Sequence, residues 1–278
     1  MTTTSLLIFA IAGMFAGILA GFLGIGGGTV LVPLLVALKY TPVQAVGTSS
    51  LAILITAISG SFQNWRMGLF SFKRVIAIGF PAVVTAQIGA YLATQFRPYL
   101  LLASFGLLLL LNIYLVELRK QLTIKKKQEE EQQLKSPGSH DTIPKNSNIF
   151  FNPNFARIAT GSAAGILAGL FGVGGGVIMV PLQILLLGET IKVAIQTSLG
   201  VIVITAISAT IGHAFRGNVL LVEGLLLGCG GFLGAQISTR FLPKLPDEVV
   251  SLAFRTLLGI LSSYVFWQAW QNYNYFKV

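Results

Sequence analysis

Long apolar segments alternate with short polar turns along almost the whole chain. A helix needs about 20 apolar residues to span a bilayer, and the stretches near residues 5–23, 43–62, 75–96, 99–117, 193–211, 219–238 and 249–270 approach that length. Proline, lysine or arginine marks many of the turns between them, as expected where helices end at a membrane surface. The pattern predicts an all-α polytopic membrane protein.

The first apolar segment is too long to be one straight transmembrane helix. It runs for 33 residues from Leu6 to Leu38, which would make a helix of about 50 Å in a hydrocarbon core of about 30 Å. Four glycines lie within residues 24–28, ahead of Pro33, and each disfavours helix by about 1 kcal/mol relative to alanine. We expect a break there. The chain then either kinks and continues across or turns back as a re-entrant hairpin.

The same pattern occurs twice. Twelve of eighteen residues are identical between 17–34 and 165–182, and TSSLAILITAIS at 48–59 recurs as TSLGVIVITAIS at 197–208. Two homologous transmembrane repeats are therefore predicted, at 1–118 and 155–278, joined by a charged cytoplasmic linker at 119–154. Each repeat would contain one glycine-broken element and three transmembrane helices, giving about eight hydrophobic segments.

The form of the break decides how the two repeats are related. A first element that crosses the membrane gives parallel repeats, whereas a hairpin gives inverted repeats. With the linker in the cytoplasm, inversion places Lys192, Arg240 and Lys244 inside, and the parallel arrangement places Arg216 and Lys277 inside. Cytoplasmic loops are enriched in Lys and Arg, so three basic residues against two favour inverted repeats.

Composition agrees with a membrane protein and narrows its class. Hydrophobic residues make up 54% and charged residues 10% of the 278 residues, against about 25% charged residues in soluble domains. Eight of the 19 Lys and Arg residues lie between Glu117 and Arg157, so the net positive charge fits a solvated loop and we expect no nucleic-acid binding. The sequence offers no constellation for catalysis, a metal or another cofactor.

The glycine breaks are the predicted substrate site. Backbone groups freed by a broken helix cannot face lipid, so protein or a water-filled cavity must cover them. Each half-helix after a break directs free amides and a positive dipole end toward the glycines, which favours anions. Repeated hydroxyl residues in the next helix lie early enough to reach the same point. The predicted substrate-binding residues are Gly24, Gly26, Gly27, Gly28, Thr48, Ser49, Gly172, Gly174, Gly175, Gly176, Thr197 and Ser198, with Pro33 and Pro181 assigned to the helix breaks.

Other small and polar residues are expected to have structural roles. The glycines at four-residue spacing, Gly13-Gly17-Gly21 and Gly161-Gly165-Gly169, predict close helix packing. His213 aligns with Asn64 near the end of a repeated helix. We expect it at the membrane interface, in preference to a role as a proton carrier.

The two motifs resemble a known family. The segments GILAGFLGIGGGTVLVP and GILAGLFGVGGGVIMVP, each followed by a Thr-Ser pair, closely resemble the TauE/SafE, or sulfite exporter, family of membrane transporters. The resemblance covers both repeats and implies a plasma-membrane permease of about eight hydrophobic segments, from a family linked to sulfite, sulfonates and related anions. Its glycine-proline signature falls on residues 24–33 and 172–181, and its Thr-Ser pairs on 48–49 and 197–198.

The sequence therefore predicts a secondary transporter that moves a small anion by alternating access around the two breaks. The expected partners are the anion and the lipid bilayer, and the oligomeric state stays open, a homo-oligomer included. A channel-like or accessory membrane subunit is the main alternative. An intramembrane lipid enzyme is a further alternative, which the lack of catalytic groups disfavours.

Overall fold

The computed structural model describes residues 3–115 and 153–275, and the predicted linker lies outside them apart from its last two positions. The first repeat contains α1 (Thr3–Leu23), α2 (Gly28–Ala37), α3 (Pro42–Arg66), α4 (Phe72–Gln95) and a further helix at Pro98–Leu115. The second contains α6 (Pro153–Phe171), α7 (Gly176–Leu187), α8 (Ile191–Ala214), α9 (Leu221–Phe241), the short 3-10 helix η1 (Leu242–Lys244) and α10 (Asp247–Tyr275). In the described ranges, 7 helices are long and apolar enough to cross a membrane.

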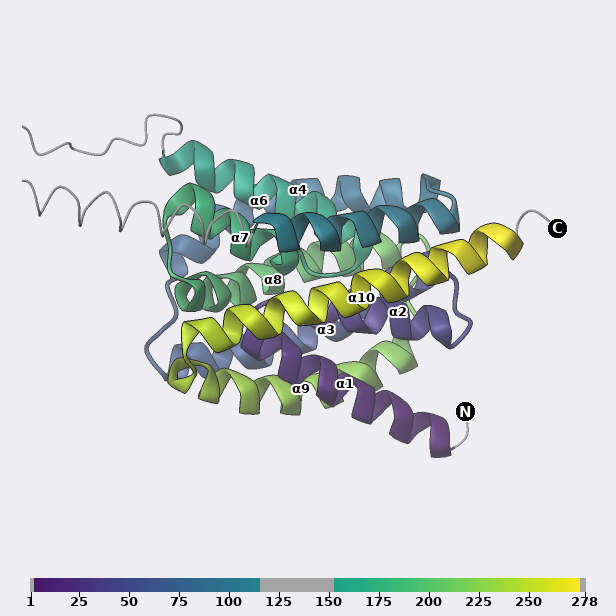
Figure 1. The fold of residues 1–278 in the computed structure, drawn as a ribbon, viewed down its shortest axis with the longest axis horizontal. Coiled ribbons are helices and arrows are strands. Elements are labelled where there is room, and N and C mark those ends of the chain that lie inside the picture. The colour runs from purple at the N-terminus through teal and green to yellow at the C-terminus, as the bar shows by residue number, and fades with distance from the viewer. Residues whose placement is uncertain (1–2, 116–152, 276–278) are drawn as a thin grey trace, which may run out of the picture.

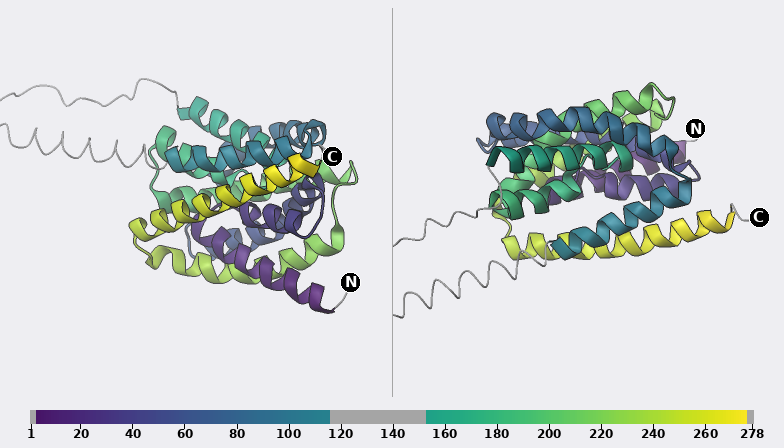
Figure 2. Two further views of the ribbon diagram at one scale, coloured as in Figure 1. Left: turned by 45° about the vertical axis from the view of Figure 1, so that its right-hand side comes forward. Right: turned by 90° about the horizontal axis from the view of Figure 1, so that it is seen from above.

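Two sets of contacts identify the opposite ends of the helix bundle. At one end the Tyr40 hydroxyl, just after α2, donates a 3.2 Å hydrogen bond to the carboxylate of Glu223 in the first turn of α9. At the other end Arg74, in the first turn of α4, lies 3.5 Å from the carboxylate of Glu189, which follows α7. We call these the Tyr40 end and the Arg74 end. The N-terminal end of α1 and the C-terminal end of α10 both lie at the Tyr40 end (Figures 1 and 2).

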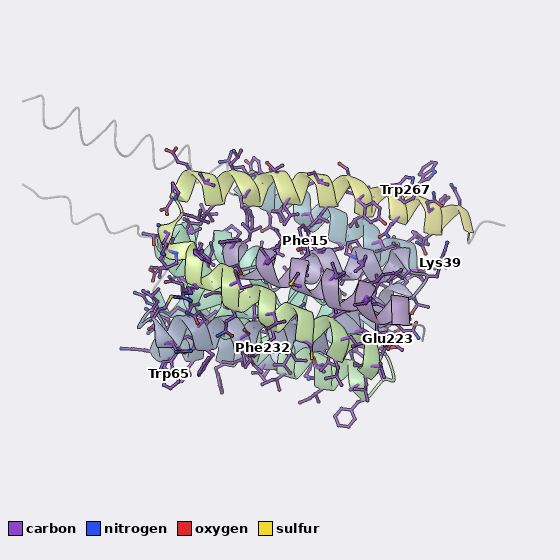
Figure 3. The ribbon with its side chains drawn as sticks, turned by 90° about the horizontal axis from the view of Figure 1, so that it is seen from below. Phe15, Lys39, Trp65, Glu223, Phe232 and Trp267 are labelled. Carbon is purple, nitrogen blue, oxygen red and sulfur yellow. The ribbon has the colours of Figure 1, made fainter. Side chains whose placement is uncertain are left out.

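The first element is a hairpin, not a helix that continues across. Helix α1 enters from the Tyr40 end and α2 returns to it (Figure 1). Figure 3 shows Lys39, just after α2, at the same end as Glu223, whereas Trp65 in the last turn of α3 lies at the opposite end. Only α3, α4 and the helix Pro98–Leu115 therefore run the length of the bundle in this repeat.

The second repeat begins from the other end. Helix α6 starts at the Arg74 end and α7 returns to it, so the two hairpins enter the bundle from opposite sides (Figure 1). Each hairpin packs against a helix of the other repeat. Helix α1 of the first repeat lies along α9 of the second, and α6 of the second repeat lies along α4 of the first, the helix that corresponds to α9. Helices α3 and α8 cross at the centre, where Ile53 and Ala57 pack with Ile202 and Ala206.

Small residues allow the hairpins to pack closely against their neighbours. A Cβ placed on Gly17 of α1 would lie 2.3 Å from the carbonyl oxygen of Gly231 in α9, and one on Gly169 of α6 would lie 2.1 Å from that of Ala86 in α4. Distances this short leave no room for a side chain. The close packing predicted for the glycines at four-residue spacing is confirmed, and it fits the way small residues bring membrane helices together.

Candidate functional site

Each break is a tight turn that requires glycine. Between the end of α1 at Leu23 and the start of α2 at Gly28, the residues Gly24, Gly26 and Gly27 have φ angles of 67°, 76° and 79°. Residues with a Cβ atom rarely adopt this left-handed region, whereas glycine adopts it readily. The second break repeats the conformation, with φ angles of 62°, 70° and 76° at Gly172, Gly174 and Gly175.

The assignment of the prolines to the breaks is wrong. Pro33 and Pro181 lie inside α2 and α7, five residues after the first helical glycine of each. A proline at this position removes one backbone donor, but the helix continues through it. The carbonyl of Pro33 accepts a 2.8 Å hydrogen bond from the Gln268 side chain of α10, so Pro33 helps to anchor α2 after the break instead of making the break.

The two breaks contact one another in the interior of the protein. A Cβ on Gly28 would lie 2.3 Å from the carbonyl oxygen of Gly172, and one on Gly176 would lie 2.2 Å from that of Gly24. The start of α2 therefore faces the end of α6, and the start of α7 faces the end of α1. In each pair the positive end of one helix dipole meets the negative end of another.

The serines of the two Thr-Ser pairs link each repeat to the other repeat's break. The Ser49 hydroxyl of α3 donates a 2.6 Å hydrogen bond to the carbonyl of Gly172, and the Ser198 hydroxyl of α8 donates a 2.8 Å bond to that of Gly24. Both side chains are fully buried. The prediction that these serines lie at the breaks agrees with these contacts, but each lies at the break of the opposite repeat.

The threonines are arranged differently from the serines. Thr48 is buried and accepts a 3.1 Å hydrogen bond from the backbone amide of Leu220, in the connection before α9. Its counterpart Thr197 is also buried. Thr205, which was not among the predicted site residues, donates a 2.9 Å bond to the carbonyl of Gly174. The repeated TAIS sequence around Thr205 was the available signal for this contact.

One buried hydroxyl at the first break has no partner. Thr29 is the second residue of α2, its side chain is fully buried, and its Oγ1 makes no hydrogen bond. The first amides of a helix also lack intrahelical acceptors. The second repeat has Val177 at this position. The start of α2 thus combines first amides without intrahelical acceptors, a positive dipole end and an unpartnered hydroxyl, within a site where residues 23–29 are closed off from solvent.

Comparison with known proteins identifies the chain. The model of the sulfite exporter TauE/SafE family matches residues 9–265. The chain belongs to this family. It is 26% identical to the probable membrane transporter protein YunE of Bacillus subtilis, over 92% of this chain and 96% of the relative. It is 29% identical to YdhB of the same organism over 88% and 95% of the two chains, and 24% identical to a probable membrane transporter protein of Methanocaldococcus jannaschii over 93% and 94%. No solved structure is significantly similar to it.

The family assignment fixes the general role of the protein. Its matched relatives are probable membrane transporter proteins. This TauE/SafE protein is a multi-pass plasma-membrane protein, with seven candidate membrane-spanning helices in the described ranges. Within residues 3–115 and 153–275, no three His, Cys, Asp or Glu side chains come together.

His213 of this TauE/SafE protein is buried against a neighbouring helix. Its side chain in the last turn of α8 is fully buried, and Nε2 lies 2.8 Å from the carbonyl oxygen of Gly169 in α6. The sequence placed it near a helix end, which is correct. What the sequence does not reveal is that α6 covers this end of α8, because the contact joins residues 44 positions apart.

Proposed function

We propose that the protein is a secondary transporter of a small anion, in particular a sulfur oxyanion or a small sulfonate, and that the anion binds at the start of α2 and α7. The observation that carries the proposal is the unpartnered Thr29 hydroxyl in the first turn of α2, where the first amides of the helix have no intrahelical acceptor. A buried hydroxyl without a partner costs about 1–3 kcal/mol, so a ligand that accepts its hydrogen bond would recover that energy. The name of the family supports an oxidised sulfur compound.

The described conformation is closed around this site. The carbonyl oxygens of Gly172 and Gly24 lie against the starts of α2 and α7, where the oxygens of an anion would lie. We propose that the two hairpins separate when the anion enters. The anion then replaces the carbonyls next to the amides of Gly26–Gly28 and Gly174–Gly176, and the Ser49 and Ser198 hydroxyls turn from the carbonyls to the anion.

The entry of the hairpins from opposite ends supports alternating access. Movement of the α1–α2 hairpin would open the site toward the Tyr40 end, and movement of the α6–α7 hairpin would open it toward the Arg74 end. Each serine bonds to the hairpin of the other repeat. Movement of either hairpin would therefore open the contact between the two breaks. A carrier of this kind exposes the anion to one side at a time.

The test measures uptake of labelled sulfite, thiosulfate and isethionate, a small sulfonate, into proteoliposomes. We expect saturable uptake of at least one of them, and counterflow, in which internal unlabelled anion accelerates entry of the labelled anion. Counterflow separates a carrier from a channel-like subunit. Absence of protein-dependent uptake of all three anions would overturn the proposed substrate class, and uptake without counterflow would overturn alternating access.

The chain offers a matched set of variants for the site. Thr29→Val introduces the residue that the second repeat carries at Val177, and we expect it to raise KM about tenfold because one hydrogen bond to a charged ligand is lost. Thr160→Val is the control, since Thr160 is also buried with an unpartnered hydroxyl but lies in α6, 12 positions before Gly172. Equal KM values for the wild type and Thr29→Val would remove Thr29 from the site.

A further inference from the structure

His213 is an ionisable residue inside the membrane-spanning part of the protein, and the proposed anion site does not use it. It is one of the two histidines in the chain, and its side chain is 0% exposed. Burying an ionisable side chain at membrane depth is costly, and such residues often mark ion or proton pathways. The contacts of His213 therefore need a functional explanation.

The hydrogen bond to Gly169 identifies which ring nitrogen is free. A backbone carbonyl can only accept, so Nε2 must carry the hydrogen in its 2.8 Å contact with the Gly169 oxygen. The neutral ring then has no hydrogen on Nδ1. This nitrogen is buried and has no partner in the structure. It is free to accept a proton without any loss of the bond to Gly169.

The imidazole lies between the outside of the bundle and the first turn before the break. Gly169 precedes Gly172 by three residues, which is about 4.5 Å along a helix. In the other direction, α8 ends at Ala214 and residues 214–217 are exposed. A proton needs to travel only about one helical turn from that end to reach Nδ1, and the protonated ring would then be close to the proposed anion site.

Four of the helices around His213 supply no counter-charge for an imidazolium, and the connection after α8 leads to Glu223 in the first turn of α9, whose carboxylate accepts the Tyr40 hydrogen bond. Gly169 comes from α6, Gly47 of α3 lies next to the His213 Cβ, and Gln87 of α4 lies next to the preceding residue, Gly212. Helices α3, α4, α6 and α8 contain no Asp or Glu.

The charged side chain that is closest to His213 along the chain is positive. Arg216 follows His213 by one turn, donates to the Gly212 carbonyl, and holds its guanidinium carbon 5.7 Å from the centre of the Tyr91 ring. A positive charge on His213 would therefore be balanced by an anion at the break and by no protein carboxylate from these four helices.

The other repeat shows that the fold does not require histidine here. Asn64 occupies the equivalent position in α3 and is also fully buried, with both polar atoms of its amide unpartnered. An asparagine side chain has no protonation equilibrium in the physiological range. The two repeats therefore differ at this position in one property: His213 can bind and release a proton, and Asn64 cannot.

From these contacts we propose that His213 binds one proton together with each transported anion, so that the protein is a proton–anion symporter. The proposal rests on the anion transport proposed above. In each cycle Nδ1 accepts a proton from water on the side from which the anion enters, and the imidazolium attracts the anion to the break. When the site opens to the opposite side, the anion leaves and Nδ1 returns the proton to water there, while Nε2–H keeps its bond to Gly169.

The experiment uses the full-length protein in proteoliposomes that contain the pH-sensitive dye pyranine. Uptake of labelled thiosulfate and isethionate, which do not form a membrane-permeant acid near neutral pH, is measured in parallel with internal pH. We expect entry of the transported anion to acidify the lumen, and an inwardly directed proton gradient to accumulate the anion above its external concentration. His213→Asn, which copies Asn64, should lose both effects, while exchange of labelled for unlabelled anion becomes independent of pH.

Two controls keep the outcomes distinct. Asn64→Ala should retain proton flux in step with anion uptake, since this position does not titrate. If His213→Asn does not fold, His213→Gln, whose amide can also donate to Gly169, takes its place. Anion uptake by the wild type without luminal acidification would overturn proton symport and leave anion transport standing. Acidification that persists in His213→Asn and in His213→Gln would exclude His213 as the proton site.

Discussion

Ser49 in the first repeat donates a 2.6 Å hydrogen bond to the backbone carbonyl of Gly172 in the second repeat. The same bond is repeated with the roles of the repeats exchanged, from Ser198 to Gly24. Each glycine carbonyl lies at the end of a broken helix, where no further residue of that helix can bond to it. The two halves of the protein are thus joined at their breaks by a reciprocal pair of serine hydroxyls.

Removal of these hydroxyls should loosen the closed state. We expect Ser49→Ala and Ser198→Ala each to lower the free energy of unfolding by about 1–3 kcal/mol, because a buried carbonyl loses its donor. Both should also weaken anion binding if the hydroxyls turn to the anion. Ser50→Ala is the control, since the Ser50 hydroxyl is buried but bonds only to Val46 in its own helix. Thermal unfolding in detergent and KM for uptake measure the two effects, and equal losses in all three variants would contradict the special role of the breaks.

The contact between the breaks should also be sensitive to a single methyl group. Gly28 and Gly176 do not have left-handed backbone, so alanine fits their backbone conformation but not the space, which the carbonyls of Gly172 and Gly24 occupy. We expect Gly28→Ala and Gly176→Ala to destabilise the protein by about 1–3 kcal/mol through overpacking.

A matched glycine distinguishes this crowding from a general effect of alanine. Gly259 in α10 has only a distant neighbour at 4.0 Å from a Cβ, so Gly259→Ala should be neutral or stabilising by up to about 1 kcal/mol through helix propensity. Thermal unfolding of the three variants tests the comparison. A stable Gly28→Ala protein with unaltered transport would show that the breaks separate easily and that their contact is not a tight closure.

The sequence was sufficient to locate the breaks because their cause is local. An apolar segment of 33 residues cannot remain one helix inside a bilayer, and the glycines at 24–28 are the residues that can adopt the turn. The close packing at the glycines with four-residue spacing could also be predicted, because a helix face without side chains lets a neighbouring helix approach closely. Repetition of both patterns predicted two similar halves.

Contacts between distant segments could not be predicted in this way. Nothing in the residues around Ser49 indicates that its partner is Gly172, 123 positions away, and not the glycines of its own repeat. The sequence places His213 near a helix end, but it does not reveal that α6 covers this residue. Pro33 was assigned to the break because proline disfavours helix interiors, yet the loss of one donor is tolerated where Gln268 and the rest of α10 hold α2 in place.

The contact between Tyr40 and Glu223 predicts a pH-dependent contribution to stability. Burial, together with the charge and hydrogen bond of Glu223, raises the pKa of Tyr40 above its ordinary value of 10.0. A pKa raised on folding gives stability that is present below the unfolded pKa and is lost as the pH rises through the folded one. We expect Tyr40→Phe to be less stable than the wild type by at most about 1 kcal/mol from about pH 7 to 9, and the difference to begin to fall near pH 10 and to vanish once the pH exceeds the raised pKa of Tyr40. A difference that grows above that pH would contradict the assignment.

The positions of the helix ends predict which end of the bundle faces the cytoplasm. The Arg74 end carries Arg66, Lys73, Arg74, Lys192, Arg240 and Lys244, whereas the Tyr40 end carries Lys39, Arg97 and Arg216. Basic residues are retained on the cytoplasmic side. The Arg74 end should therefore be cytoplasmic, with the start of α1 and the end of α10 outside (Figure 1).

Single cysteines give a direct test of this orientation and of the hairpins. In a Cys229→Ser background, which removes the one native cysteine, a membrane-impermeant maleimide should label Lys39→Cys in intact cells and label Lys192→Cys only after the membrane is opened. A cysteine placed before α1 should react like Lys39→Cys, because α1 and α2 enter and leave at the same end. If the cysteine before α1 reacted like Lys192→Cys instead, α1 and α2 would cross the membrane as one element, and the hairpin would be wrong for the protein in its bilayer.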